Sequence, residues 1–403
     1  MTLFDPRQHM VRLVFILGAI TALTPLAIDM YIPAFPQIAA DFGVPVARVE
    51  LSLTFFLIGL AIGQLFYGTI SDKYGRKKPL YAGMLLAIGA TITCAFIKDP
   101  NLFLFCRFVQ AIGICGGAVI ARAMVRDLFN HHESARFFSF LILVMGVAPI
   151  LAPLLGGYVA EYMGWHAIFL FIGGFTTLLL ITVAAALPET NKGNPEVRIS
   201  RSFQAYREVL RDPSFLRMAL SGAFVMAGMF AYVTGSPFVF IQYYGIPADK
   251  FGWVFGLNAL GFIVMSQVNR TLITRFKFES ILKTGFLIVG FACLLLILAG
   301  LANAPMIGFG AAIFLYVATM GVVLPNSAAM AMAEQASRAG SASAMLGSLQ
   351  FGIAFVASGA IGLAHAQTQL PLAIVVGSFG LAGAAIYLWP VLRRPVQPAI
   401  ISE

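Results

Sequence analysis

The sequence predicts an all-α integral membrane protein whose twelve transmembrane helices form two sets of six. Hydrophobic residues make up 60% of the 403 residues and charged residues only 11%, whereas soluble domains carry about 25% charged residues. The apolar residues form long unbroken runs, and a helix needs roughly 20 such residues to cross a bilayer. A transmembrane β-barrel would show alternating segments of about ten residues instead.

Twelve apolar runs can be followed along the chain, and a polar segment divides them into two halves. The first six spans are expected at 11–33, 49–71, 79–97, 102–125, 136–160 and 165–187. The second six are expected at 214–243, 250–272, 280–302, 305–332, 339–366 and 371–392. We therefore expect an N-terminal six-helix bundle at 1–187, a linker at 188–212 and a C-terminal six-helix bundle at 213–403.

The basic residues predict which loops face the cytoplasm. If both termini are cytoplasmic, only Arg48, Lys98 and Lys250 fall in loops on the opposite side, and Arg107 and Arg122 fall within the fourth span. The other 21 of the 26 Lys and Arg residues lie on the cytoplasmic side, as the positive-inside rule requires. The net charge of +9 therefore reflects membrane orientation, and we expect no nucleic-acid partner.

The linker contains apolar residues at helical spacing, with arginines on the other faces. These residues are Ile199, Phe203, Tyr206 and Leu210. The pattern predicts a cytoplasmic amphipathic helix on the inner leaflet, close to anionic membrane lipids. A solvated connector is the alternative.

Asp29 is the only carboxylate that the sequence places deep within a span. It lies near the outer end of the apolar run 11–32. An ionisable side chain costs at least a few kcal/mol in lipid, so it normally faces the protein interior or a water-filled path. Asp29 is therefore a candidate for coupling proton movement to another process.

Arg107 opens the fourth span at about the depth of Asp29. Arginine keeps its charge and needs a partner or water, so a carboxylate on a neighbouring helix is the expected partner. The alternative is that the side chain extends outward to the membrane surface. The other end of this span carries Arg122, Arg126 and Asp127, which we expect within reach of the loop that contains Asp72.

The loop after the second span contains two glycines, an acid and an arginine at regular spacing. These residues are Gly68, Asp72, Gly75 and Arg76. Asp72 can pair with Arg76 or with a basic helix end, and such a contact can stabilise one global conformation. A simple turn with positive-inside charge explains the neighbouring lysines but not this set of four.

The fifth span carries glycines and prolines at intervals of three or four. They are Gly146, Pro149, Pro153, Gly156 and Gly157. Prolines bend a helix, and small residues allow close helix contact. An ordinary packing helix is the alternative.

These motifs resemble those of a known family. Segment 68–80 resembles the signature loop of the major facilitator superfamily, and Arg107 with Gln110 and Gly113 resembles its fourth-span motif. The fifth-span stripe is similar to the antiporter motif of twelve-span drug exporters. The segments A-I-D-M-Y-I-P-A-F-P, V-R-D-L-F, G-W-H-A-I-F and L-P-E-T resemble the bicyclomycin and chloramphenicol resistance (Bcr/CflA) branch. The similarity covers nearly the whole chain, although segment 269–278 has lost the acid of the second-half loop.

The resemblance implies a drug:proton antiporter of the bacterial inner membrane. Its two bundles would contain inverted three-helix repeats around a central cavity, and would rock between inward and outward states. Asp29 would couple protons, and Asp72, Arg76 and Asp127 would form a conformational gate with Gly68 and Gly75. The proton gradient would supply the energy, no cofactor would be needed, and we expect a monomer.

The cavity wall is expected to come from spans one, four, seven and eight. Its residues would be Tyr31, Arg107, Gln110, Phe230, Tyr232, Phe238 and Asn258. Large aromatic pockets with few polar groups favour loosely defined, moderately hydrophobic substrates.

Three other function classes fit the sequence less well. A proton-coupled importer of a small metabolite on the same fold is the alternative function, but the fifth-span stripe resembles exporters. An enzyme would need a motif such as H-E-x-x-H or a nucleophile elbow, and the sequence contains neither. An ATP-driven pump would need a G-x-x-x-x-G-K-[ST] loop, which is also absent.

The four cysteines lack metal-ligand spacing, so we expect them to pack in apolar regions without a metal.

Overall fold

The computed structural model describes residues 10–129, 131–194, 199–335, 338–364 and 368–392. Within these residues it contains twelve helices of 20 to 33 residues: α1 (Met10–Asp29), α3 (Val46–Tyr74), α4 (Lys77–Phe96), α5 (Pro100–Leu128), α6 (His131–Met163), α7 (Trp165–Ala186), α9 (Pro213–Ser236), α10 (Ala248–Arg275), α11 (Phe278–Leu301), α12 (Met306–Met332), α13 (Ala339–Leu363) and α14 (Leu370–Leu392). Four short helical elements join them: η1 (Ile32–Ala34), α2 (Phe35–Phe42), α8 (Ile199–Leu210) and η2 (Pro237–Tyr243). The all-helical class is confirmed.

Eleven of the long helices in the described part of the chain are long and apolar enough to cross a membrane. For α6, the side chains of 131–146 lie outside the described residues, and the remaining apolar part is 147–163. Many large apolar side chains on the outer faces are exposed, including Phe96, Leu178 and Ile307. A soluble protein rarely exposes so much apolar surface, so these faces are where lipid contacts the protein.

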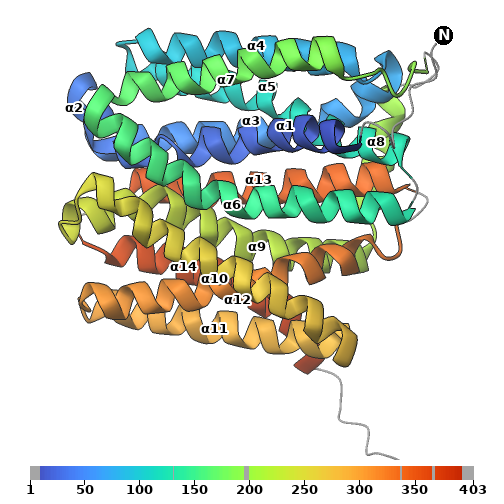
Figure 1. Cartoon of the computed structure of the whole chain (residues 1–403). Coiled ribbons are helices and arrows are strands. Elements are labelled where there is room, and N and C mark those ends of the chain that lie inside the picture. Colours follow the sequence, from blue (N-terminus) through green and yellow to red (C-terminus); the bar gives the residue numbers. More distant parts are fainter. Residues whose placement is uncertain (1–9, 130, 195–198, 336–337, 365–367, 393–403) are drawn as a thin grey trace, which may run out of the picture.

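The long helices form two halves, α1 to α7 and α9 to α14, which lie mostly in the upper and lower parts of Figure 1, with α13 at the level of α6. The most extensive contacts between the halves are α3 with α13 and α6 with α10. Each pair joins the second long helix of one half to the fifth long helix of the other. This reciprocal pairing is what a two-fold relation between the halves produces. We name the two ends of the bundle by their short helices, the α2 end and the α8 end (Figure 1).

Two helices that carry candidate site residues begin at Asp-Pro pairs. The Asp99 carboxylate accepts hydrogen bonds from the backbone N–H groups of Asn101 (2.7 Å) and Leu102 (3.0 Å) at the start of α5. Asp212 accepts one from Ser214 N–H (2.9 Å) at the start of α9. An aspartate N-cap followed by proline is a strong helix start, so α5 and α9 begin one or two residues before the expected positions.

A helix, α8, lies in the segment between the halves, and its apolar residues differ in exposure. Tyr206 and Val209 are buried, whereas Phe203 and Leu210 remain 49% and 36% exposed. The Tyr206 hydroxyl donates to the backbone carbonyl of Leu65 on α3 (2.6 Å), which turns this residue toward the protein. Ile199 lies outside the residues whose side chains are described. Glu208 forms an ion pair with Arg338 at the start of α13 (2.9 Å), so α8 contacts both halves.

Candidate functional site

Asp29 is the last residue of α1 and lies where the first span is interrupted. Two residues separate it from η1, whose first turn contains Pro33. Its side chain is buried, with the residue 5% exposed, and no hydrogen bond or ion pair of its carboxylate occurs within the described part of the structure. Asp29 lies within electrostatic reach of Tyr232 on α9. The carboxylate is therefore near the boundary between the two halves.

Arg107 on α5 is completely buried, which excludes the alternative of an outward-extended side chain. Its Nη2 donates to the backbone carbonyl of Ala27 (2.8 Å), and its Nη1 donates to Gln110 Oε1. The guanidinium carbon lies 4.0 Å from the ring centroid of Tyr31 and 4.5 Å from that of Phe56. Such cation–π contacts stabilise a desolvated cation by about 2 kcal/mol.

The expected ion pair between Arg107 and Asp29 is therefore not formed. The last carbonyl groups of a helix have no partner within the helix and attract positive charge. Ala27 is in the last turn of α1, so its carbonyl group is free to accept a hydrogen bond from the Arg107 guanidinium. This hydrogen bond takes the place of the expected ion pair with Asp29. Arg107 thus anchors the backbone two residues before Asp29 and leaves the carboxylate unpaired.

A buried polar network supports this end of α1. Gln110 donates from Nε2 to Thr91 Oγ1 on α4 (2.7 Å). The Tyr31 hydroxyl shares a hydrogen bond with Ser52 Oγ on α3 (2.9 Å). Both Gln110 and Tyr31 are fully buried. These two predicted substrate contacts therefore have internal partners that position the helix break.

The C-terminal half contributes an aromatic and amide pair from α9 and α10. Asn258 Nδ2 donates to the hydroxyl of Tyr232 (3.0 Å), and the Tyr232 ring stacks on Phe255 with centroids 5.8 Å apart. The Asn258 Oδ1 atom is buried and has no hydrogen-bond partner among the described residues. An unfilled buried acceptor can receive a hydrogen bond from a ligand without losing an internal one.

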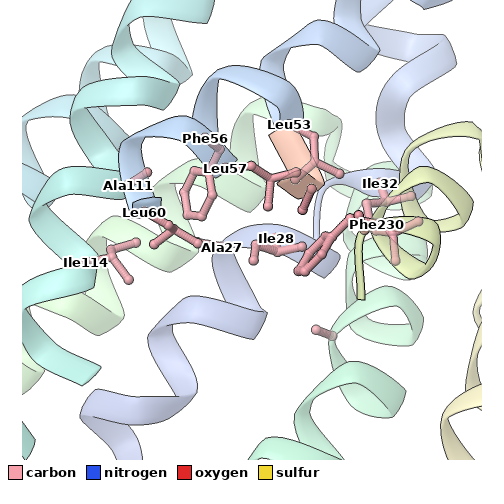
Figure 2. Packing of buried hydrophobic residues seen from close by; sticks show 14 of the residues in the cluster. Ala27, Ile28, Ile32, Leu53, Phe56, Leu57, Leu60, Ala111, Ile114 and Phe230 are labelled. Carbon is pink, nitrogen blue, oxygen red and sulfur yellow. The ribbon is translucent and has the colours of Figure 1, made fainter. Parts of the chain in front are cut away.

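Phe230, two residues before Tyr232 on α9, is 5% exposed. Its ring centroid lies 6.0 Å from that of Phe351 on α13. Figure 2 shows Phe230 in the same cluster of buried side chains as Ala27 and Ile28, the residues just before Asp29. The structure therefore brings Phe230 and Tyr232 toward the end of α1, as a wall shared by both halves requires.

Phe238 is in a different place from the other predicted wall residues. It lines a cavity of about 520 Å³ at the α2 end, between α2, α3, η2 and the adjoining ends of α13 and α14. Tyr31, Arg107, Tyr232 and Asn258 are not among the residues that line this cavity. The π-helical geometry of η2 changes the direction of residues after Ser236, and a sequence pattern alone does not show such a change.

Glu50, which also lines this cavity, is a second buried carboxylate that the sequence analysis did not single out. It lies in the second turn of α3 and is 4% exposed. The sequence places this residue at the edge of the second span, where a charge is normally hydrated. The short helix α2 and element η2 cover that edge and bury Glu50.

Two adjacent glycines of α6, Gly156 and Gly157, allow this helix to pack closely against two different segments. A Cβ atom at Gly156 would lie 1.7 Å from the carbonyl oxygen of Met30, so α6 packs directly on the backbone next to Asp29. A Cβ atom at Gly157 would lie 3.0 Å from the carbonyl oxygen of Ala248 on α10. Helix α6 therefore contacts both the end of α1 and the opposite half.

The other members of the fifth-span motif have less defined roles. Pro149 and Pro153 lie inside α6. Gly146 lies outside the residues whose surroundings are described.

At the α8 end, Arg76 is the centre of a charge cluster. Its Nη1 atom lies 2.5 Å from Asp72 Oδ1 and its Nε atom lies 2.8 Å from Asp127 Oδ2. The same Nη1 donates to Ser71 Oγ (2.8 Å). Burial lowers the pKa of Arg76, but the hydrogen bonds to Asp127 and Asp72 and the negative charges of these two residues together raise it by more, so its pKa lies above the ordinary value. The predicted cluster thus assembles within the N-terminal half.

The two glycines of this loop are not equivalent. Gly75 has a φ of +87°, and a Cβ atom there would lie 2.8 Å from the carbonyl oxygen of Asn191. Both features require glycine. At Gly68, by contrast, a Cβ atom would meet no neighbour within 4 Å. The Gly68 carbonyl accepts a hydrogen bond from Ser71 Oγ (2.9 Å).

Glu189 completes the charge cluster and was not predicted as a site residue. Its carboxylate accepts hydrogen bonds from the backbone N–H groups of Arg76 (2.8 Å) and Lys77 (3.0 Å) at the start of α4. Negative charge is stabilised at a helix N-terminus. The following residue, Thr190, donates to Asp127 Oδ2 (3.1 Å). The segment L-P-E-T carries both residues, so the signal was present in the sequence.

Comparison with known proteins agrees with this architecture. A 36% identical relative is an uncharacterized MFS-type transporter, YdgK, of Bacillus subtilis, matched over 94% of this chain and 95% of the relative. A bicyclomycin resistance protein homolog of Haemophilus influenzae is 29% identical over 94% and 96% of the two chains. A chloramphenicol resistance protein of Pseudomonas aeruginosa is 30% identical over 81% and 78%.

Solved structures show the same fold. A D-xylose-proton symporter aligns with a TM-score of 0.72 at 15% identity, covering 94% of this chain and 96% of the other. A bacterial homolog of the human lysosomal transporter Spinster aligns with a TM-score of 0.71 at 16% identity, covering 96% and 99%. The family model of the Major Facilitator Superfamily matches residues 17–359. This chain therefore belongs to the Major Facilitator Superfamily, whose members are membrane transporters rather than enzymes and need no cofactor.

Proposed function

We propose that this protein is a proton-coupled exporter of drug-like small molecules in the bacterial inner membrane, in the bicyclomycin and chloramphenicol resistance (Bcr/CflA) branch of the superfamily. Two relatives that align over most of the chain are named for resistance to these antibiotics, at about 30% identity. The distribution of basic residues supports a cytoplasmic α8 end.

The observation that carries the proposal is the buried and unpaired carboxylate of Asp29 near the boundary between the halves. An ionised carboxylate without a cation or hydrogen bonds is costly to bury, whereas the protonated acid is tolerated. A conformation that encloses Asp29 therefore favours its protonated form. A conformation that hydrates Asp29 favours its ionised form, so proton exchange becomes linked to the change in conformation.

The drug would bind between the end of α1 and the facing part of α9 and α10. Phe230 and Tyr232 provide aromatic surface, and the free acceptor of Asn258 provides a hydrogen-bonding site. Protons enter from the outside and are released inside as the drug moves outward. Each inward elementary charge gains about 2.3 kcal/mol per 100 mV of membrane potential.

The charge cluster would stabilise one end state of this cycle. Asp72, Arg76, Asp127 and Glu189 connect the second, third and fourth spans to the segment after α7. Helix α8 lies beside this end and contacts both halves. A movement of one half against the other must alter the contacts of α8 with Leu65 and with Arg338, and the energy of these contacts therefore contributes to the balance between inward and outward states.

Expression in an efflux-deficient bacterium tests the proposal. We expect the wild type to raise resistance to members of an antibiotic panel and Asp29→Asn to abolish this resistance at equal membrane abundance. Glu161→Gln is the matched control, because Glu161 is an exposed carboxylate at the α2 end of α6. Undiminished resistance with Asp29→Asn would contradict the proposal.

A further inference from the structure

Glu50 is a second buried carboxylate, and the proposed transport cycle does not use it. It is 4% exposed, and within the described residues its carboxylate has no hydrogen bond or ion pair. Arg48 is close in sequence, but it donates to Asn101 Oδ1 at the start of α5. No basic side chain lines the cavity that Glu50 faces.

The cavity beside Glu50 is large and mostly apolar. Its volume is about 520 Å³, within the roughly 300–1,000 Å³ range of sites that bind drug-sized ligands. Both halves form it, with α2 and α3 on one side and η2, α13 and α14 on the other. Apart from Glu50, the only polar side chain among its described lining residues is that of Gln242.

We propose that this cavity is a binding site for lipophilic organic cations. A buried carboxylate is stabilised when a cation approaches it within the same low-dielectric space. The apolar wall, which includes Phe238, Ile361 and Leu372, would hold the hydrophobic body of such a ligand. A neutral ligand would not stabilise the ionised form of Glu50, and that form would repel an anion.

The site is separate from the one that contains Asp29. Asp29, Tyr232 and Asn258 do not line this cavity. The inference also does not depend on the proposed export, because binding to the purified protein at equilibrium requires no transport and no gradient.

Equilibrium dialysis of tetraphenylphosphonium against the full-length protein in lipid nanodiscs tests the inference. All variants carry Asp29→Asn, so that the other buried acid cannot hold the probe. We expect this protein to bind the probe and the added Glu50→Gln substitution to weaken the affinity by on the order of tenfold or more. Adding Glu161→Gln, the exposed control, should leave the affinity unchanged.

A second variant separates the site from any effect of Glu50 on folding. Ala40 is exposed and lines the cavity, so Ala40→Trp fills the cavity and keeps both Glu50 and the helix packing. We expect Ala40→Trp to weaken probe binding as strongly as Glu50→Gln does. The inference is overturned if the Asp29→Asn protein does not bind the probe, or if either Glu50→Gln or Ala40→Trp leaves its affinity unchanged.

Discussion

The contact between Gly156 and the backbone of Met30 predicts the effect of adding one methyl group. In Gly156→Ala, the new Cβ atom would start 1.7 Å from the Met30 carbonyl oxygen. The two helices must separate by at least about 1.3 Å to reach even 3.0 Å, below which Cβ contacts are essentially not seen. Overpacking of this kind typically costs about 1–3 kcal/mol. Alanine favours the helix by only about 0.5–1 kcal/mol over glycine, so the net effect is destabilising.

Thermal unfolding of the purified variant, together with drug efflux in cells, measures this effect. We expect a lower unfolding temperature and reduced efflux, because the displaced residue adjoins Asp29. Gly174→Ala in α7 is the matched control, since no atom lies within 4 Å of its Cβ position. It should unfold at the wild-type temperature or above. If Gly156→Ala is as stable and active as Gly174→Ala, the close packing of α6 on the end of α1 is refuted.

Two further predictions concern the charge cluster. Arg76→Lys keeps the positive charge, but the lysine side chain cannot contact both oxygens of Asp127 and also Asp72. We expect reduced efflux and a lower unfolding temperature. Wild-type values for both measurements would contradict the role of the guanidinium. Glu189→Gln removes the negative charge from the start of α4, where such a charge contributes about 0.3–1 kcal/mol to stability. We expect a small decrease in the unfolding temperature, and a smaller decrease at high salt. An unfolding temperature equal to that of the wild type at low salt would contradict a stabilising role of the Glu189 charge.

The all-helical membrane fold could be predicted because a lipid environment restricts a spanning segment to a few structures. Long apolar runs therefore locate the helices, and the basic loops indicate their direction. The charge cluster of Arg76, Asp72 and Asp127 was also predictable, since the fourth span returns Asp127 to the same end of the bundle as the loop that contains Arg76.

The contacts that were missed depend on backbone geometry rather than on residue type. The partner of Arg107 is a carbonyl group freed by the end of α1, and any residue at position 27 would provide one. The burial of Glu50 depends on the short helix α2 and on η2, which cover the end of α3. Glu189 meets Arg76 across 113 residues of chain, and the segment L-P-E-T marks Glu189 without showing that it lies at the start of α4.

Proton movement in proteoliposomes tests the role of Asp29 most directly. The purified protein is reconstituted with a pH-sensitive dye inside the vesicles, and a drug that it exports is added as a gradient. The wild type should move protons against the drug, whereas Asp29→Asn should exchange labelled for unlabelled drug without any change in internal pH. Drug-driven proton movement at the wild-type rate in Asp29→Asn would show that another group couples the two fluxes.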